Sequence, residues 1–318
     1  MKTPVLFLVF RRPDTTARVF DAIRRARPPR LYVAADGPRN ATDAAACAAS
    51  RRAATQVDWP CELHTRFRDS NLGCRAAVSD ALSWFFSREE EGIVLEDDCL
   101  PDASFFGFCE ELLERYRGDG RVMSIGGNNF QDGVRRGAGS YFATKHFHCS
   151  GWASWRRAWA EYDGELSRIG GTLAAGLAQL QDGSAAFSRY WLQIYRDCRA
   201  GRYSSWAYPM SLTCFARTGA GRETLHLAPQ VNLVANIGFG EHGTHVSARD
   251  KNLFASASAL ALPLVHPERL VRDAAADRHT DLVLYRVGWI PLLKDRLVRL
   301  LPGVHRAWQR LRAGRSPH

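Results

Sequence analysis

The chain of 318 residues has no apolar run long enough to cross a membrane. Its apolar runs, such as PVLFLVF at residues 4–10, are far shorter than the ~20 residues that a spanning helix needs. Arg11 and Arg12 end this run at once, and no small-residue cleavage site follows, which is not typical of a signal peptide. We therefore expect a cytoplasmic protein whose first buried strand is residues 4–10.

Disulfide and zinc signatures are also missing. The eight cysteines include no C-x-x-C pair, and several stand inside apolar runs. This spacing predicts reduced, partly buried thiols. We find no internal repeat and no low-complexity linker either.

Acidic residues are outnumbered, and the net charge is +10. From Glu268 to the end, eleven Lys and Arg stand against five Asp and Glu, a net +6. A basic segment favours anionic partners, such as lipid headgroups, nucleic acid or nucleotide phosphates. Because the sequence contains no known nucleic-acid motif, we expect no nucleic-acid partner.

Short apolar strands alternate with helical segments through the first part of the chain. This order predicts an α/β fold with a mainly parallel sheet and helices on both faces. The expected strands are residues 4–10, 31–35, 62–67, 93–98 and 122–127. Asp14 and Asp102 are expected to cap two of the helices between them.

The chain divides into one domain and a tail. We expect the domain to cover residues 1–265, with a first half over residues 1–127 and a less regular half over 128–265. Residues 266–318 are expected to form a basic, amphipathic helical tail.

Three acids, Glu96, Asp97 and Asp98, end the expected fourth strand, IVLEDD. In open α/β sheets ligands bind beyond the carboxyl ends of the strands, where the last carboxylates can converge. Their oxygens suit Mg²⁺ or Mn²⁺, and a diphosphate leaving group needs such a cation. The alternative is an acidic turn; the apolar residues before the triplet and Pro101 after it favour the site.

Asp36 has the same placement at the end of the second expected strand. There it can accept a hydrogen bond from a nucleobase imide. A solvated Asp-Gly turn is the alternative.

Several segments together resemble GT-A glycosyltransferases, namely N-acetylglucosaminyltransferase I and its bacterial relatives, which are inverting enzymes. IVLEDDCLPDASFF is similar to their motif strand and following helix, and TPVLFLVFRRPDTT, VAADG and NLGCRAAVSDAL are similar in type and order. The second half resembles a bacterial group of nucleotide-diphospho-sugar transferases in GWASWRRAWAEYD, RYWLQIY and NLVANIGFGEHGTH. The resemblance covers roughly residues 3–250. It implies a GT-A fold with a nucleotide-binding half (1–127) and an acceptor half with a lid loop (128–265).

The resemblance also implies roles for the matching residues. Asp98 would ligate the metal, and Asp97 and Glu96 would contact ribose, sugar or metal-bound water. Asp36 would read the uracil of a UDP-sugar. The other donor contacts would come from Arg11 or Arg12 and from Asn71, Gly73 and Arg75.

In the second half, Gly151, Trp152 and Trp155 would shape the acceptor or sugar pocket, because an aromatic face stacks well on a sugar ring. Core packing is the alternative for the tryptophans. The glycines in NIGFGEHGTH permit the backbone changes of a closing lid. The expected lid residues are Gly238, Gly240, His242 and His245, and His245 is a candidate metal ligand beside Asp98.

One departure concerns the general base. Many relatives carry W-D-Y in the strand after the YW helix, whereas this chain has SSWAYPM with Ala207 at the place of the aspartate. Glu241 is the nearest candidate base, and Asp163 and Glu165 are others.

The expected activity is transfer of a hexosyl or N-acetylhexosaminyl group to a glycan or lipid-linked glycan. Residues 282–301 place Leu282, Tyr285 and Trp289 on one helix face among cations, which suits peripheral docking on an anionic membrane, such as the inner face of the plasma membrane. Packing of this helix on the domain is the alternative. Two other functions stay open: an inactive sugar- or nucleotide-binding homologue, favoured by Ala207, and a sugar nucleotidyltransferase, disfavoured because FRRPDTT has no glycine.

Overall fold

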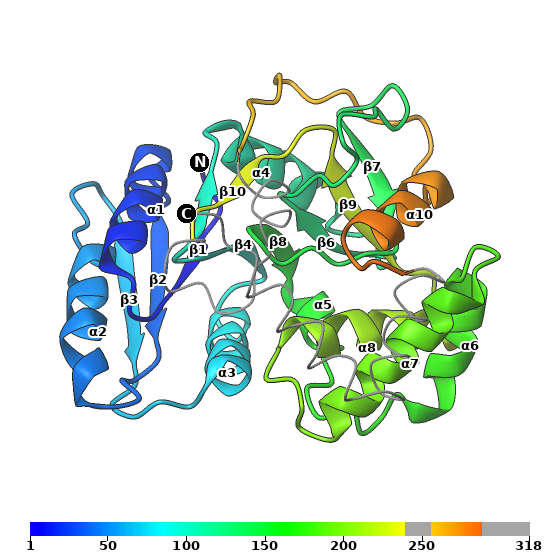
Figure 1. Cartoon of the computed structure of the whole chain (residues 1–318). Coiled ribbons are helices and arrows are strands. Elements are labelled where there is room, and N and C mark those ends of the chain that lie inside the picture. The colour runs from blue at the N-terminus through cyan, green and yellow to red at the C-terminus, as the bar shows by residue number, and fades with distance from the viewer. Residues whose placement is uncertain (239–255, 288–318) are drawn as a thin grey trace, which may run out of the picture.

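The computed structural model describes residues 1–238 and 256–287. Within these ranges an eight-stranded sheet has the order β3-β2-β1-β4-β8-β6-β9-β7. These strands are β1 (Val5–Val9), β2 (Arg30–Ala35), β3 (Glu62–Phe67), β4 (Glu91–Glu96), β6 (Val122–Gly126), β7 (Tyr141–Thr144), β8 (Trp152–Trp155) and β9 (Leu225–Pro229). Strands β3, β2, β1 and β4 are mutually parallel, whereas β8 and β7 run antiparallel to their neighbours. The expected α/β class with a mostly parallel sheet is confirmed (Figure 1).

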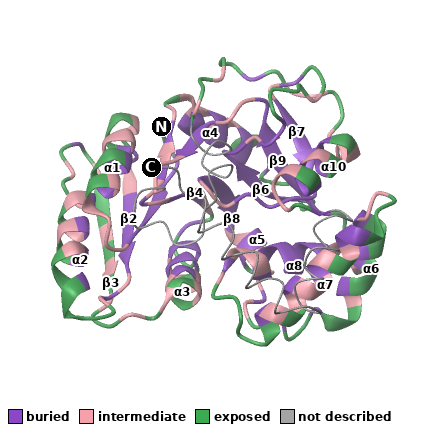
Figure 2. Cartoon of the chain, in the orientation of Figure 1, coloured by how far each residue is buried: buried purple, intermediate pink, exposed green. Residues whose placement is uncertain are grey.

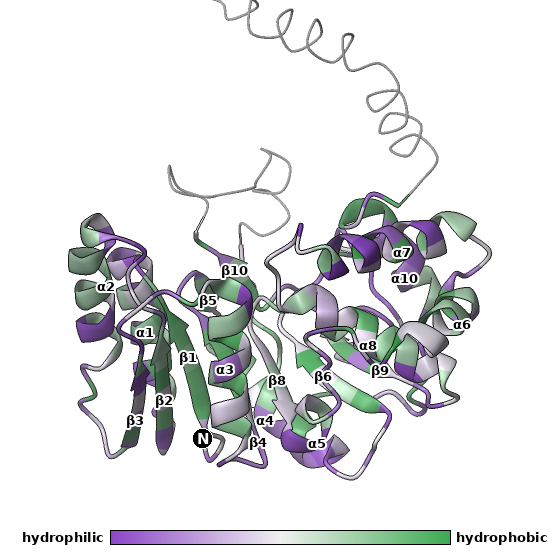
Figure 3. Ribbon diagram, turned by 90° about the horizontal axis from the view of Figure 1, so that it is seen from below, coloured by the Kyte–Doolittle hydropathy of each residue, from purple (hydrophilic) through white to green (hydrophobic). Residues whose placement is uncertain are grey.

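Helices cover both faces of this sheet because alternate strand residues point to opposite sides. Val5, Phe7 and Val9 face α1 (Pro13–Ala26), α2 (Ala41–Ala54) and α4 (Ser104–Tyr116). Leu6 and Leu8 face α3 (Cys74–Phe86), on the side where α5 (Arg156–Trp159) also packs. Strands β1, β2 and β4 between these layers are buried (Figure 2) and largely hydrophobic (Figure 3), whereas the edge strand β3 is more exposed and polar.

A short two-stranded sheet continues the chain beyond β4. Strand β5 (Cys99–Pro101) pairs antiparallel with β10 (Val234–Asn236), with Asn236 opposite Cys99. This pairing brings the start of the NIGFG segment next to the acids at the end of β4.

The second half contains a group of three helices with a core of its own: α6 (Gly170–Leu180), α7 (Ala185–Arg199) and α8 (Ala207–Gly219). Helices α6 and α8 pack closely because a Cβ at Gly176 would lie 1.8 Å from the Phe215 carbonyl oxygen. The SSWAYPM segment, where the resemblance implies a strand, instead begins α8 at Ala207.

Two expected helix caps differ in detail. Helix α1 begins at Pro13, whose missing N–H suits the first helical position, so Asp14 lies inside the first turn and Arg12 is the N-cap. Asp102 stands two residues before α4, and its Oδ1 accepts from the Ser104 amide at 2.9 Å.

The segment after residue 265 does not stand apart as a tail over its described part. Helix α10 (Ala274–Val283) packs beside β7, and its Asp281 reaches the fully buried Nζ of Lys145 at 2.9 Å. Tyr285 packs against Trp191, with 5.1 Å between ring centroids. For this residue the structure therefore shows packing on the domain, the alternative to membrane docking. Trp289 and the rest of the predicted helix lie outside the described residues. No described helix is long and apolar enough to span a membrane.

We predict that Asp281→Ala lowers the free energy of unfolding by about 3 kcal/mol, because removing one partner of a buried ion pair leaves a buried charge undercompensated. Urea unfolding followed by circular dichroism measures the change. Arg278→Ala, an exposed position on the same helix, is the matched control and should change stability by less than about 0.5 kcal/mol. Equal effects of the two variants would contradict a structural role for the buried pair.

Candidate functional site

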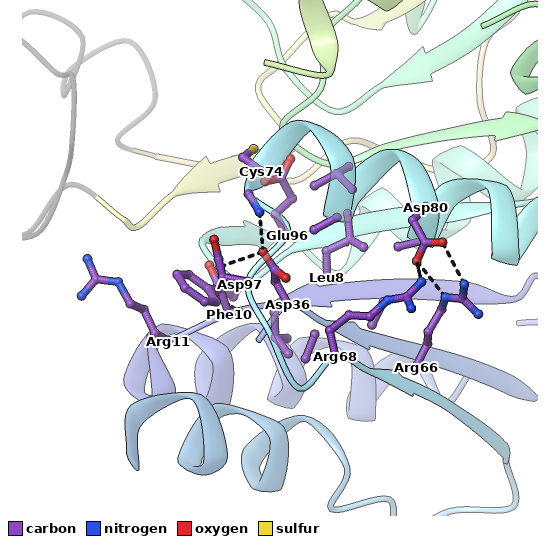
Figure 4. Close-up of a pocket in the computed structure, with 18 of the residues that line it drawn as sticks. Leu8, Phe10, Arg11, Asp36, Arg66, Arg68, Cys74, Asp80, Glu96 and Asp97 are labelled. Carbon is purple, nitrogen blue, oxygen red and sulfur yellow. Dashed lines mark hydrogen bonds and ion pairs between the residues drawn. The ribbon is translucent and has the colours of Figure 1, made fainter. Parts of the chain in front are cut away.

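A cavity of about 440 Å³ lies at the carboxyl ends of β1, β2, β3 and β4, beside the first turns of α3. Its polar lining consists mainly of Arg11, Arg12, Asp36, Arg39, Arg66, Arg68, Asn71, Asp80, Glu96, Asp97 and Asp98. Seven residues predicted from the sequence are therefore brought together here: Arg11, Asp36, Asn71, Gly73, Glu96, Asp97 and Asp98. Figure 4 shows Asp97 beside Phe10 at one end, the Asp80 group at the other, and Leu8 between them.

The acids after β4 are held by neighbouring parts of the fold. Asp97 Oδ2 accepts from the Phe10 amide at 3.0 Å, which ties it to the end of β1. Arg12 Nη1 donates to Asp98 Oδ2 at 2.7 Å and lies 3.5 Å from Asp97 Oδ1. The carboxylates are thus positioned by backbone and guanidinium donors rather than left as a solvated turn.

Burial and mutual repulsion disfavour charge on these acids. Burial raises the pKa of Asp97 to about 6, and the Asp98 carboxylate adds to this shift while Arg12 opposes it. Burial, followed by the charges of Asp98 and Asp97, raises the pKa of Glu96 well above its usual range. A further cation at this end of the cavity would relieve the repulsion.

The two arginines after β1 have different positions. Arg12 contacts the acid pair, and the pKa of its guanidinium is raised because Asp98 and Asp97 outweigh the effect of burial. Arg11 instead lies 3.5 Å from Asp43 on α2 and extends away from the middle of the cavity (Figure 4). Of the pair left open by the sequence, Arg12 is the residue that faces the acids.

Asp36 is occupied in holding the loop before α3. Its Oδ1 accepts from the amides of Gly37 and Leu72, and its Oδ2 accepts from Asn71 Nδ2 and the Gly73 amide, all at 2.8–3.1 Å. Four accepted hydrogen bonds use the lone-pair sites of a carboxylate. Gly37 lets the two loops meet, because a Cβ there would lie 2.3 Å from the Ser70 carbonyl carbon. Asp36 therefore positions Asn71 and Gly73, with no acceptor site left over for a base imide.

The acid pair is approached by the start of the predicted lid. The Ile237 amide donates to the Asp98 carbonyl at 2.8 Å, and a Cβ at Gly238 would lie 2.5 Å from Asp98 Oδ2. Only glycine fits at this approach. Gly240, Glu241, His242 and His245 lie outside the described residues.

Four residues predicted for the site do not line the cavity. Arg75 donates to the Gly164 carbonyl and to Glu165. Gly151 packs against Val234, and Trp155 is buried in the core with its Nε1 on the Leu113 carbonyl at 3.3 Å. Trp152 is also buried, which corresponds to the core-packing alternative for both tryptophans.

Trp152 nevertheless contacts a residue that reaches the acids, namely Trp206. Its ring stacks on Trp206 with centroids 5.6 Å apart, and a hydrogen bond from Trp206 opposes the pKa shift of Glu96. Trp206 directly precedes Ala207, so the segment where relatives carry their aspartate does come near the acids. Trp206 could have been found from the tryptophan of the W-D-Y motif.

Neither described candidate for the general base lies in the cavity. Asp163 is buried and accepts from the Arg168 amide at 2.7 Å. Glu165 is exposed and pairs with Arg75 at 2.6 Å.

The sequence interpretation missed the far end of the cavity. Asp80 on α3 accepts from Arg66 Nε and Nη2, each at 2.8 Å, and from Arg68. The Arg66 hydrogen bonds, against the effect of burial, lower the pKa of Asp80 to about 2. The alternation of residues 62–67 places Arg66 on the face opposite to Leu63 and Phe67, but it does not reveal which helix or strand lies beside it.

The acid pair fits a hard divalent cation in ligand chemistry, because Asp97 and Asp98 offer only carboxylate oxygens. Over residues 1–238 and 256–287, no group of three His, Cys, Asp or Glu side chains is arranged to hold a metal ion. Mg²⁺ or Mn²⁺ at Asp98 would therefore use further ligands, such as phosphate oxygens and the waters that these ions commonly keep.

Comparison with known proteins gives little. No protein-family model and no curated protein matches the sequence. Among solved structures, the chain is similar to the crystal structure of mouse Xyloside xylosyltransferase 1 in its apo form, at 9% sequence identity and a TM-score of 0.37. The match covers 84% of this chain and 98% of that chain. A likeness this weak carries no argument, so function must be argued from the site itself.

We predict that Asp36→Asn loosens the loop before α3, because an amide nitrogen would replace one acceptor and face the Asn71 and Gly73 donors. Hydrogen exchange at Leu72 and Gly73 should become faster, and the free energy of unfolding should fall by roughly 1–3 kcal/mol. Asp69→Asn, an exposed position in the same loop, is the control with the same charge change. Unchanged exchange at both amides would contradict the anchoring role.

Proposed function

We propose that the protein is a metal-dependent glycosyltransferase that moves a sugar from a nucleotide-sugar, with UDP as the nucleotide, to a glycan or lipid-linked glycan. The observation that carries this proposal is one cavity at the carboxyl ends of parallel strands. An acid pair, an adjacent arginine and the apolar side chains of Leu8 and Ala34 line it together. Ligands of open α/β sheets bind at such an end. The resemblance of the sequence motifs to GT-A enzymes supports the same conclusion.

The acid end suits the diphosphate. Asp98, with Asp97 beside it, would hold Mg²⁺ or Mn²⁺, and the bound ion would neutralise charge on the departing diphosphate. Arg12 lies 2.7 Å from Asp98 and can donate to a phosphate oxygen from the same place. Gly238 brings the chain close to Asp98 at the start of the predicted lid segment.

Neither Asp163 nor Glu165, the described candidates for the general base, lines the cavity where the acceptor would react. A general base must come within hydrogen-bond reach of the acceptor hydroxyl, which Ala207 cannot supply. Glu241 remains the candidate base, and His245 remains a candidate metal ligand. Transfer of a hexosyl or N-acetylhexosaminyl group with inversion stays the proposal that follows from the resemblance.

A second candidate function is a sugar- or nucleotide-binding module without transferase activity. It is favoured by Ala207 and by the distance of Asp163 and Glu165 from the cavity lining. Nucleotide binding is common to both functions, whereas turnover belongs only to the first. Peripheral docking on an anionic membrane stays a proposal for the basic residues beyond 287.

We predict that UDP together with Mn²⁺ raises the melting temperature of the protein. At a hundredfold excess over Kd the stabilisation is about 2.7 kcal/mol. A thermal-shift panel of nucleoside diphosphates with and without Mn²⁺ measures it. The proposal fails if no nucleoside diphosphate stabilises the protein in either condition.

We predict that Asp98→Asn removes the contribution of Mn²⁺ to UDP binding and abolishes transfer while leaving the fold intact, because an amide is a poorer ligand for a hard cation. Calorimetric titration of UDP with and without Mn²⁺ measures the loss. Asp69→Asn again serves as the control with equal charge change. A variant that keeps the full metal effect would locate the metal elsewhere.

A further inference from the structure

One row of side chains crosses four strands at the floor of the cavity. Leu8 of β1 is in register with Glu96 of β4 on one side and with Ala34 of β2 on the other, and Ala34 is in register with Arg66 of β3. In-register residues of parallel strands point to the same face of the sheet. Three strand spacings separate the ends of the row, or about 14 Å. An acid therefore stands at one end, an arginine at the other, and two apolar side chains lie between them.

The opposite wall of this space comes from α3. Ala77, Val78 and Ala81 line the cavity together with Leu8 and Ala34, at the edge of the core where α3 packs on the sheet. We call this space, bounded by Leu8, Ala34, Ala77, Val78 and Ala81, the apolar slot. Apolar side chains from both the sheet and the helix suit an aromatic ring, which buries apolar surface on entering.

The end of the slot at Arg66 and Arg68, away from the acids, is rich in hydrogen-bond donors. Asp80 accepts from Nε and Nη2 of Arg66 and from Nη2 of Arg68, so two guanidinium groups share one carboxylate. Arg68 Nε is buried and has no hydrogen-bond partner among the described residues. Because arginine carries five N–H donors and no acceptor, several donors of this pair remain for a ligand.

The expected reader of the base is not free for that role. Asp36 already accepts four hydrogen bonds from its own loop and from residues 71–73. A ring in the apolar slot would therefore be recognised at its far edge, by the guanidinium groups that line the cavity there.

We propose that the apolar slot binds the nucleobase of the donor and that Arg68, with Arg66, selects a base carrying a carbonyl at its far edge. This inference rests on the proposed function and names the base-recognition site within it. In a pyrimidine nucleotide the substituent at C4 lies farthest from the ribose and would reach the arginine end of the slot. Uracil presents an acceptor oxygen at that place, whereas cytosine presents an amino group that would face other donors. The site therefore favours UDP over CDP.

The test compares two nucleotides on the same protein. Calorimetric titrations with UDP and with CDP, both with Mn²⁺, give a ratio of affinities that does not depend on the fraction of folded protein. We expect UDP to bind at least about tenfold more tightly, since a polar site rejects a ligand that leaves its groups unpaired. Arg68→Ala and Arg68→Lys should each reduce the ratio several-fold, because lysine retains the charge but loses the planar set of donors.

Two further variants sharpen the result. Arg52→Ala, an exposed arginine on α2, should leave the ratio unchanged. Asp36→Asn should weaken both nucleotides alike if Asp36 only holds the loop. The inference is overturned if wild type binds UDP and CDP equally, if both Arg68 variants retain the ratio, or if Asp36→Asn alone removes it. Failure to bind any nucleoside diphosphate would overturn the proposed function as well.

Discussion

The in-register pairing of β3, β2, β1 and β4 is the constraint on which the site depends. Because these four strands are parallel, their carboxyl ends meet at one edge of the sheet, and the row from Glu96 to Arg66 forms across it. A one-residue slip of β3 would turn Arg66 to the opposite face and remove the donors from the slot. The register of β2, β1 and β4 is enforced by their apolar side chains, which are buried on both faces of the sheet. The edge strand β3 is largely exposed, and the ion pairs of Arg66 and Arg68 with Asp80 tie it to α3.

Hydrogen bonds between the strand ends fix the positions of the side chains that line the cavity. The acids after β4 are tied to the end of β1 through the Phe10 amide and Arg12, and the loop before α3 is tied to the end of β2 through Asp36. In each of these connections a carboxylate accepts hydrogen bonds from several donors. Hydrogen bonds to a charged group are stronger than those between neutral groups. The cavity is consequently shaped by connections between strand ends, while the slot between them stays apolar.

Much of this arrangement could be predicted from the sequence. The apolar runs predicted where the parallel strands lie along the chain, and seven residues chosen from strand ends and motifs do line one cavity. Arg66, Arg68 and Asp80 could not be predicted, because their meeting depends on which strand lies beside which and on where α3 begins. Trp155 was expected at the pocket but lies in the core, since a tryptophan in an aromatic motif is compatible with either place. The helix at Ala207 and the docking of α10 likewise depend on packing between distant segments.

A crystal structure of the protein with UDP and Mn²⁺ tests the central claim most directly. The account predicts the uracil ring between the sheet and α3, its C4 carbonyl oxygen within about 3 Å of a guanidinium nitrogen of Arg68 or Arg66. It also predicts the diphosphate at the Asp98 end, with Mn²⁺ on that carboxylate. A nucleotide bound outside this cavity would contradict the account. So would a base that is hydrogen-bonded to Asp36 and lies outside the apolar slot.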